Sequence, residues 1–216
     1  NQLHLTIKLI SPKVLVSVAS LQLLTIALLI RQWKTVAEMV GVFPSWRDLL
    51  ELNMRGEFFD TITPGAKIGG ELARVYVLRK RLDISLGDGV LVVGLQKSLS
   101  LVSFLTLSIV SLLWFCLNTR VQTLYMVIFV IGLIFLLGLL TLLIGFTIYK
   151  AEVEKLIIKI PLGKKIKEKI NDFLNNYYSS FENLRDSKKN YIGQTALSVL
   201  IWLIFALKMY VLAYYL

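Results

Sequence analysis

The residue types best suited to chemistry lie in one short segment, 63–74, where a proline and three glycines interrupt two helical stretches. Glycine lets a backbone approach a ligand closely. The free amides at the start of the following helix form a site for an anion, to which Lys67 adds positive charge. A phosphate group fits such a site. The candidate residues are Pro64, Gly65, Lys67, Gly69, Gly70, Glu71 and Arg74.

Glu71 and Arg74 stand three residues apart on one face of the second helical stretch and can form an ion pair. A structural interpretation stays open beside the anion site. In that interpretation the glycines serve tight helix packing and the pair stabilises the fold. The spacing of the glycines does not match a phosphate loop for dinucleotides or nucleotides.

Residues that could catalyse a reaction are scarce. The chain has one histidine, His4, and one cysteine, Cys116. Catalysis by a nucleophile or a general base requires such groups to be placed together, and these residues and the scattered acids form no such constellation. We therefore expect no enzyme activity, no catalytic residue, no metal site and no cofactor.

The composition predicts an all-α, polytopic transmembrane helical bundle. Of the 216 residues, 56% are apolar and 18% are charged, against about 25% charged in soluble domains. These values exclude disorder, a disulfide scaffold and an ordinary cytosolic enzyme. About 20 apolar residues are needed to cross the hydrocarbon core as a helix. We predict four spans within a single transmembrane domain, 1–216, which we expect to be part of a longer chain; the spans are 14–30, 98–117, 121–149 and 192–216.

The basic residues indicate how the chain is oriented. The net charge of +10 is better explained by the positive-inside rule and by anionic inner-leaflet lipid than by nucleic acid. The basic linker 150–190 is predicted to be cytoplasmic, as are Arg31 and Arg79. The segment between those two arginines is too short and too polar for two full crossings. We therefore predict a re-entrant helix pair at 46–80, which is tolerated where it is buried in protein or lines a wet cavity.

Local signals predict where individual helices begin. Ser45 with Asp48, and Ser85 with Asp88, form two capping boxes. The segment 164–184 has the periodicity of an amphipathic helix with a basic opposite face, lying on the inner leaflet or packed across the bundle. Its predicted buried face consists of Ile166, Ile170, Phe173, Tyr177 and Leu184.

Lys208 is a further candidate, because it lies inside the fourth predicted span. A lysine within a spanning helix is costly and suggests a function by default. It could neutralise a lipid phosphate in a cavity. The alternative is that its side chain snorkels to the outer interface.

The run PGAKIGGELARVYVLRKR at 64–81, after FFDTIT at 58–63, resembles the signature of the flippase-like integral membrane family related to the lysylphosphatidylglycerol synthase transmembrane region. The matching positions are Pro64, Gly69, Gly70, Glu71, Arg74 and Tyr76. The resemblance implies a multi-pass protein of the plasma membrane of a bacterium or archaeon. It implies binding or moving a phospholipid or a lipid-linked head group. It implies no lysine transfer by these residues, because the soluble aminoacyl-transfer domain of the synthases is not matched.

Two functions follow from these observations. The first is a flippase-like protein that binds or translocates a phospholipid or a lipid-linked anionic head group. The alternative is a non-transporting membrane scaffold or regulatory subunit that presents lipid to a partner enzyme, which predicts a filled, dry bundle. The expected partner is membrane phospholipid, including anionic inner-leaflet lipid, and not nucleic acid. Self-association into a homo-oligomer is compatible with the sequence.

Overall fold

The computed structural model describes residues 11–63, 68–118, 122–159, 163–184 and 188–215, and every regular element in these ranges is a helix. The all-α prediction is therefore confirmed. Pro64, Gly65 and Lys67 lie outside the described residues. The helices are α2 (Pro12–Met39), α3 (Trp46–Ile62), α4 (Ile68–Leu82), α5 (Leu86–Asn118), α6 (Thr123–Ile148), α7 (Lys150–Lys159), α8 (Lys164–Asn183) and α9 (Lys188–Tyr215).

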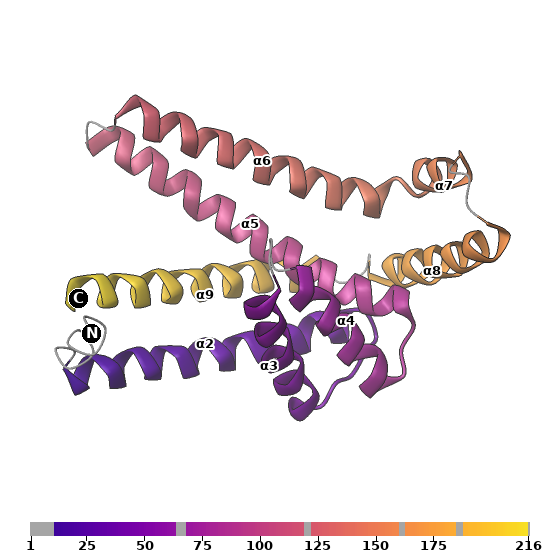
Figure 1. Cartoon of the computed structure of the whole chain (residues 1–216), viewed down its shortest axis with the longest axis horizontal. Helices are drawn as coiled ribbons and strands as arrows, with labels where there is room; N and C mark the ends of the chain where they lie inside the picture. The colour runs from indigo at the N-terminus through magenta and orange to yellow at the C-terminus, as the bar shows by residue number, and fades with distance from the viewer. Residues whose placement is uncertain (1–10, 64–67, 119–121, 160–162, 185–187, 216) are drawn as a thin grey trace.

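Four of the described helices are long and apolar enough to span a membrane: α2, α5, α6 and, over Tyr191–Tyr215, α9. They coincide with the four predicted spans. The helices α2 and α9 lie side by side, and the first residues of α2 and the last residues of α9 lie at the same end of this pair (Figure 1). The α5–α6 hairpin diverges from the pair toward that end, while α7 and α8 lie at the other. This arrangement alternates the ends of the four long helices, as the predicted topology requires.

The helix α6 differs from the other three long helices because none of its residues is buried. Its sequence is apolar on all sides, so every face suits contact with lipid or with another apolar helix. Cys116, near the end of α5, is also exposed. Of the two locations that its apolar neighbours allow, in the core or facing lipid, the exposed side chain fits the second.

The two capping boxes form as predicted. The Ser45 hydroxyl accepts the backbone N–H of Asp48 at 3.3 Å, and the Asp48 carboxylate accepts the backbone N–H of Ser45 at 3.0 Å. Ser85 and Asp88 make the same two bonds, at 3.0 Å and 3.3 Å. These side chains satisfy amides that the first turn of a helix leaves unpaired. They explain why α3 and α5 begin where they do.

The helices α3 and α4 pack against each other as a hairpin beside α2 and α5. Neither belongs to the candidate spans, since both are short and carry charge. Two helices with a break between them are thus found where a re-entrant pair is predicted; their depth in a membrane stays a prediction. The main hydrophobic core joins this hairpin to α2 and α5, through Trp33, Val36, Ala37, Val42, Leu49, Leu52, Val75, Val77, Leu78, Val92, Val93 and Leu99.

The predicted amphipathic helix is α8, and it packs on the first half of α5. Tyr177 and Leu184 are buried there, together with Leu174 and Tyr178, which the periodicity did not single out. The prediction for Ile166 is wrong, because that side chain is 52% exposed. The physical reason is position: α8 extends past the first residues of α5, so its first turns have only the short helix α7 beside them (Figure 1).

Candidate functional site

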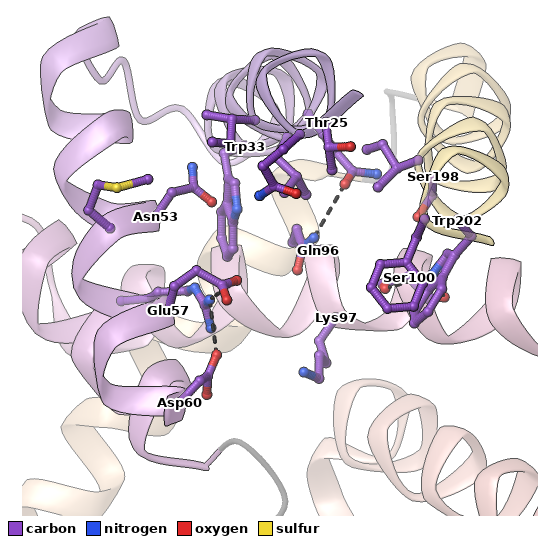
Figure 2. Close-up of a pocket in the computed structure, with 18 of the residues that line it drawn as sticks. Thr25, Trp33, Asn53, Glu57, Asp60, Gln96, Lys97, Ser100, Ser198 and Trp202 are labelled. Carbon is purple, nitrogen blue, oxygen red and sulfur yellow. Dashed lines mark hydrogen bonds and ion pairs between the residues drawn. The ribbon is translucent and has the colours of Figure 1, made fainter. Parts of the chain in front are cut away.

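A cavity of about 300 Å³ lies among α2, α3, α4, α5 and α9 (Figure 2). Three of the sequence candidates, Glu71, Arg74 and Lys208, line it together. Gly69 and Gly70 do not, although they lie on the same helix as Arg74. The lining also includes Gln22, Thr25, Gln32, Asn53, Glu57, Asp60, Gln96, Lys97, Ser100 and Ser198 among its polar members, and Ile26, Leu29, Trp33, Met54, Ile201, Trp202 and Phe205 among its apolar and aromatic ones.

Arg74 is the centre of an ionic cluster in the wall of this cavity. Its side chain is only 7% exposed. One guanidinium nitrogen, Nη2, lies 3.2 Å from Asp60 Oδ2 and 3.5 Å from Glu57 Oε1. The other, Nη1, lies 3.4 Å from Glu71 Oε1. Carboxylates from both α3 and α4 therefore hold the guanidinium, and Figure 2 shows Glu57 and Asp60 turned toward it.

The glycines of the hairpin allow this cluster to form. A Cβ added to Gly56 of α3 would lie 2.5 Å from Arg74 Cζ, so only glycine leaves room for the guanidinium. Gly70 faces the Asp60 carboxylate, and Gly69 faces the Thr63 side chain, at distances too short for a Cβ. The close approach at Gly69 and Gly70 is thus between α4 and side chains of α3, which matches the packing interpretation of these glycines. A ligand at the start of α4 remains a prediction.

Lys97 of α5 extends the cluster. Its Nζ donates a hydrogen bond to Glu71 Oε1 at 2.7 Å. Glu71 therefore accepts from Lys97 while it also contacts Arg74. The Lys97 side chain lines the cavity (Figure 2).

Lys208 lies on α9, in the wall that α2 and α9 form. The residue is 7% exposed, and its Nζ donates to Gln22 Oε1 at 2.6 Å. Among the described residues no carboxylate lies within ion-pair distance of this amino group. The side chain thus points into the bundle, and the structure does not show it snorkelling to an interface. Gln22 satisfies one hydrogen bond of the Lys208 amino group, but as a neutral amide it does not balance the positive charge.

A layer of amides and hydroxyls joins the three long helices around the cavity. The Gln96 side chain donates to Gln32 Oε1 at 3.3 Å (Figure 2), and Gln32 donates to the backbone carbonyl of Gln194 at 3.3 Å. Trp202 donates through its indole N–H to the Ser100 carbonyl at 3.2 Å. Sequence reasoning missed these residues. Gln32 and Gln96 lie just outside the predicted spans 14–30 and 98–117, so the apolar runs gave no signal for them.

Three polar atoms of the ionic cluster have no hydrogen-bond partner among the described residues. They are Asp60 Oδ1, Glu71 Oε2 and Arg74 Nε, all buried. Buried polar atoms are paired in the great majority of proteins. Asp60 Oδ1 faces Gly70 and Arg74 Nε faces Gly56, so these two atoms are enclosed in the contact between α3 and α4.

A comparison with known protein families identifies the family of this chain. The sequence description of the lysylphosphatidylglycerol synthase TM region matches residues 1–216. The chain belongs to this family. The resemblance inferred from the segment 58–81 is therefore confirmed. As a member of the lysylphosphatidylglycerol synthase TM region family, the chain is a multi-pass membrane protein.

The chain is also similar to the UPF0104 membrane protein MJ1595 of the archaeon Methanocaldococcus jannaschii, to which it is 25% identical over 150 residues. The match covers 69% of this chain and 44% of the archaeal protein. The chain thus aligns with less than half of that relative. No solved structure is significantly similar to this chain.

Proposed function

We propose that the protein binds the head group of a phospholipid, or of another lipid-linked anion, in the cavity among α2, α3, α4, α5 and α9, and moves it across the membrane. The observation that carries this proposal is the convergence of Arg74 and Lys208 on one cavity, although they lie far apart in the sequence. Lys208 is buried and has no carboxylate within ion-pair distance among the described residues, and such a cation suits an anion, because burying an uncompensated charge is otherwise costly.

The size and lining of the cavity support this function. Its volume of about 300 Å³ is at the lower end of the range for small-molecule sites, about 300–1,000 Å³. That space suits a polar head group, while the acyl chains stay in lipid. Ile26, Leu29, Ile201 and Phe205 provide apolar lining beside the amides. The alternative function, a non-transporting scaffold, predicts a filled and dry bundle and is therefore less favoured.

The charges of the site indicate where the phosphate binds. A phosphate at Arg74 would compete with Glu57, Asp60 and Glu71 for the guanidinium. A phosphate at Lys208 would only replace the neutral amide of Gln22. We therefore assign the first phosphate contact to Lys208, and to Arg74 a contact that requires its carboxylates to rearrange.

The function as proposed involves no chemical reaction, no cofactor and no nucleic acid. The partner is the membrane lipid itself, and anionic inner-leaflet lipid is the ligand whose charge suits Lys208. The archaeal relative supports a location in the plasma membrane of a bacterium or archaeon.

The test compares Lys208→Gln with Lys155→Gln. Lys155 is an exposed lysine of α7 that contacts only Glu152 at 3.7 Å, so its substitution controls for the loss of one positive charge. A charged hydrogen bond contributes about 1.5–3 kcal/mol, so Lys208→Gln should weaken binding of phosphatidylglycerol about ten- to hundredfold. Lys155→Gln should bind as the parent does.

The same proteins are then placed in vesicles with a fluorescent phosphatidylglycerol, and its appearance in the opposite leaflet is measured. The parent and Lys155→Gln should move the lipid, and Lys208→Gln should move it more slowly. Lipid that binds but does not cross in any variant would favour the scaffold function. Equal binding by all variants would exclude Lys208 as a phosphate contact.

A further inference from the structure

The ionisable side chains that line the cavity balance one another. Among the described residues they are the carboxylates of Glu57, Asp60 and Glu71 and the cations of Arg74, Lys97 and Lys208. Three negative and three positive charges give no net formal charge when all are ionised. An anionic head group that enters this cavity therefore adds a negative charge that the protein does not compensate.

The acidic end of the cavity has unused hydrogen-bonding capacity. The Asp60 side chain is 5% exposed; its Oδ2 accepts from Arg74, whereas its Oδ1 has no partner among the described residues. Glu71 accepts from Lys97 through Oε1, and its Oε2 is likewise unpaired in the described part of the chain. A carboxylate that gains a proton becomes a hydrogen-bond donor. Asp60 Oδ1 and Glu71 Oε2 are thus suited to hold a proton.

A negative charge nearby favours the protonated form of a carboxylic acid, and low polarity favours it further. A phosphodiester at Lys208 would place such a charge in the same cavity as Asp60 and Glu71. Burying a net charge between apolar helices is costly. Uptake of one proton by the cavity removes this net charge.

We propose that each singly charged anionic head group is bound together with one proton, which Asp60 and Glu71 hold between them. The inference rests on the proposed function, since it concerns the same cavity. The proton comes from water when the lipid enters and returns to water when the lipid leaves. Both carboxylates contact Arg74, so a proton on either one removes a negative charge from the same ionic cluster. Lipid movement is thereby coupled to proton movement.

Other charged groups also face the cavity from the helices around Asp60 and Glu71. The hairpin contributes Glu57 from α3 and Arg74 from α4, α5 contributes Lys97, and α9 contributes Lys208. The helix α2 contributes no ionisable group to the lining, only the neutral side chains of Gln22, Thr25, Ile26, Leu29, Gln32 and Trp33. Of the carboxylates, Glu57 is 60% exposed on its side chain, so its charge is screened by solvent and it is the least suited to hold the proton.

The experiment uses the whole protein, purified in a neutral detergent, and two short-chain lipids. Phosphatidylglycerol and phosphatidylcholine both contain a phosphodiester, but only the first has a net charge. Titration calorimetry in two buffers of different ionisation enthalpy counts the protons taken up. We expect one proton for each phosphatidylglycerol and none for phosphatidylcholine. The Kd for phosphatidylglycerol should then rise about tenfold per pH unit.

Two variants locate the proton. Asp60→Asn and Glu71→Gln each remove one negative charge, so the cavity with a bound anion is neutral without a proton. Either variant should bind phosphatidylglycerol with no proton uptake and with little dependence on pH. The matched control is Glu51→Gln, a carboxylate of α3 outside the cavity that pairs with Arg55 at 2.7 Å and with Arg81. It should keep the proton uptake of the parent.

The outcomes separate this inference from the function on which it rests. Phosphatidylglycerol binding without proton uptake by the parent overturns the proton coupling and leaves the head-group site intact. No binding of phosphatidylglycerol at any pH overturns the proposed function itself. Equal uptake with phosphatidylcholine, or uptake that survives both substitutions, overturns the assignment to the pair. Phosphatidylcholine binding by Asp60→Asn and Glu71→Gln reports that the variants are folded.

Discussion

The guanidinium of Arg74 lies 3.2 Å from the carboxylate of Asp60, measured from Nη2 to Oδ2, and both side chains are buried. The pair joins α4 to α3 at the wall of the cavity. Arg74 was selected from the sequence as a ligand for phosphate, but in the fold it first organises carboxylates. Its two roles can be separated by experiment, because a structural pair and a ligand site respond differently to conservative substitution.

Arg74→Lys should impair lipid handling although it keeps the charge. Arginine binds several oxygens at once through a planar fork, whereas lysine offers one point charge. The lysine variant should remain folded, because its amine can still pair with one carboxylate. Arg74→Ala should handle lipid less well still. It should also lower the free energy of unfolding by about 3–5 kcal/mol, because it leaves buried carboxylates without their partner.

The measurements for Arg74 are lipid transfer in vesicles and denaturant unfolding in detergent. Lipid transfer at the rate of the parent by two well-folded variants would show that Arg74 does not contribute to lipid handling.

Gly56→Ala should displace Arg74 from its carboxylates. The new Cβ would lie 2.5 Å from Arg74 Cζ, so the guanidinium must move. Overpacking of this kind costs about 1–3 kcal/mol. The matched control is Gly138→Ala on α6, where nothing lies within 4 Å of an added Cβ and alanine favours a helix. Thermal unfolding of both variants checks the prediction, which fails if Gly56→Ala is as stable as Gly138→Ala.

Gly87→Ala should loosen α8 from α5. An added Cβ at Gly87 would lie 2.6 Å from the backbone nitrogen of Tyr177, which cannot move without the helix. At Gly89 the nearest atom is a side-chain carbon of Val75 at 3.4 Å, an ordinary contact, so Gly89→Ala is the control. Hydrogen exchange of α8 amides should become faster in the first variant only. Equal protection of α8 in both would mean that the contact at Gly87 does not hold the two helices together.

Tyr177 provides an optical signal for the same interface. Burial raises the pKa of its phenol above the usual value, although a hydrogen bond with Thr147 partly opposes this effect. The stability that the neutral phenol contributes is present below its ordinary pKa and is lost as the pH rises through the raised one. Burial also raises the pKa of the adjacent Tyr178 phenol, so ultraviolet titration should detect late-ionising tyrosines, and Gly87→Ala should bring the pKa of Tyr177 down. Tyr177→Phe identifies the contribution of Tyr177, since the late signal must decrease in this variant.

The helix pair α3–α4 should begin and end on one side of the membrane. Lys34 precedes the pair, Lys80 lies near its end, and both are exposed. We expect cysteines placed at these two positions, in a Cys116→Ser background, to react with an impermeant reagent from the same side. A cysteine at Tyr214, near the C-terminal end of α9, should react from the opposite side of the membrane. Opposite labelling of positions 34 and 80 would contradict the re-entrant topology.

The sequence by itself determined the helices and their approximate ends. In lipid, the backbone N–H and C=O groups of a long apolar run are hydrogen-bonded within the run when it forms a helix. Four spans could therefore be predicted from composition. The capping boxes at Ser45 and Ser85 involve residues three apart in the chain, and such local hydrogen bonds need no tertiary information. The family signature also needs no tertiary information, because it lies in one continuous segment of the sequence.

Only the tertiary structure decided which residues share the cavity. Nothing in the spacing of Lys208 and Gln22, or of Lys97 and Glu71, indicates that they are hydrogen-bonded, since each pair joins two helices whose packing depends on the whole bundle. The role of Asp60 depends on packing for the same reason, because it follows from the position of its side chain over Gly70, on the next helix. Ile166 was assigned to a buried face because periodicity reports the face of a helix but not the length of its neighbour. Local pattern thus determined the elements, and long-range packing determined the site.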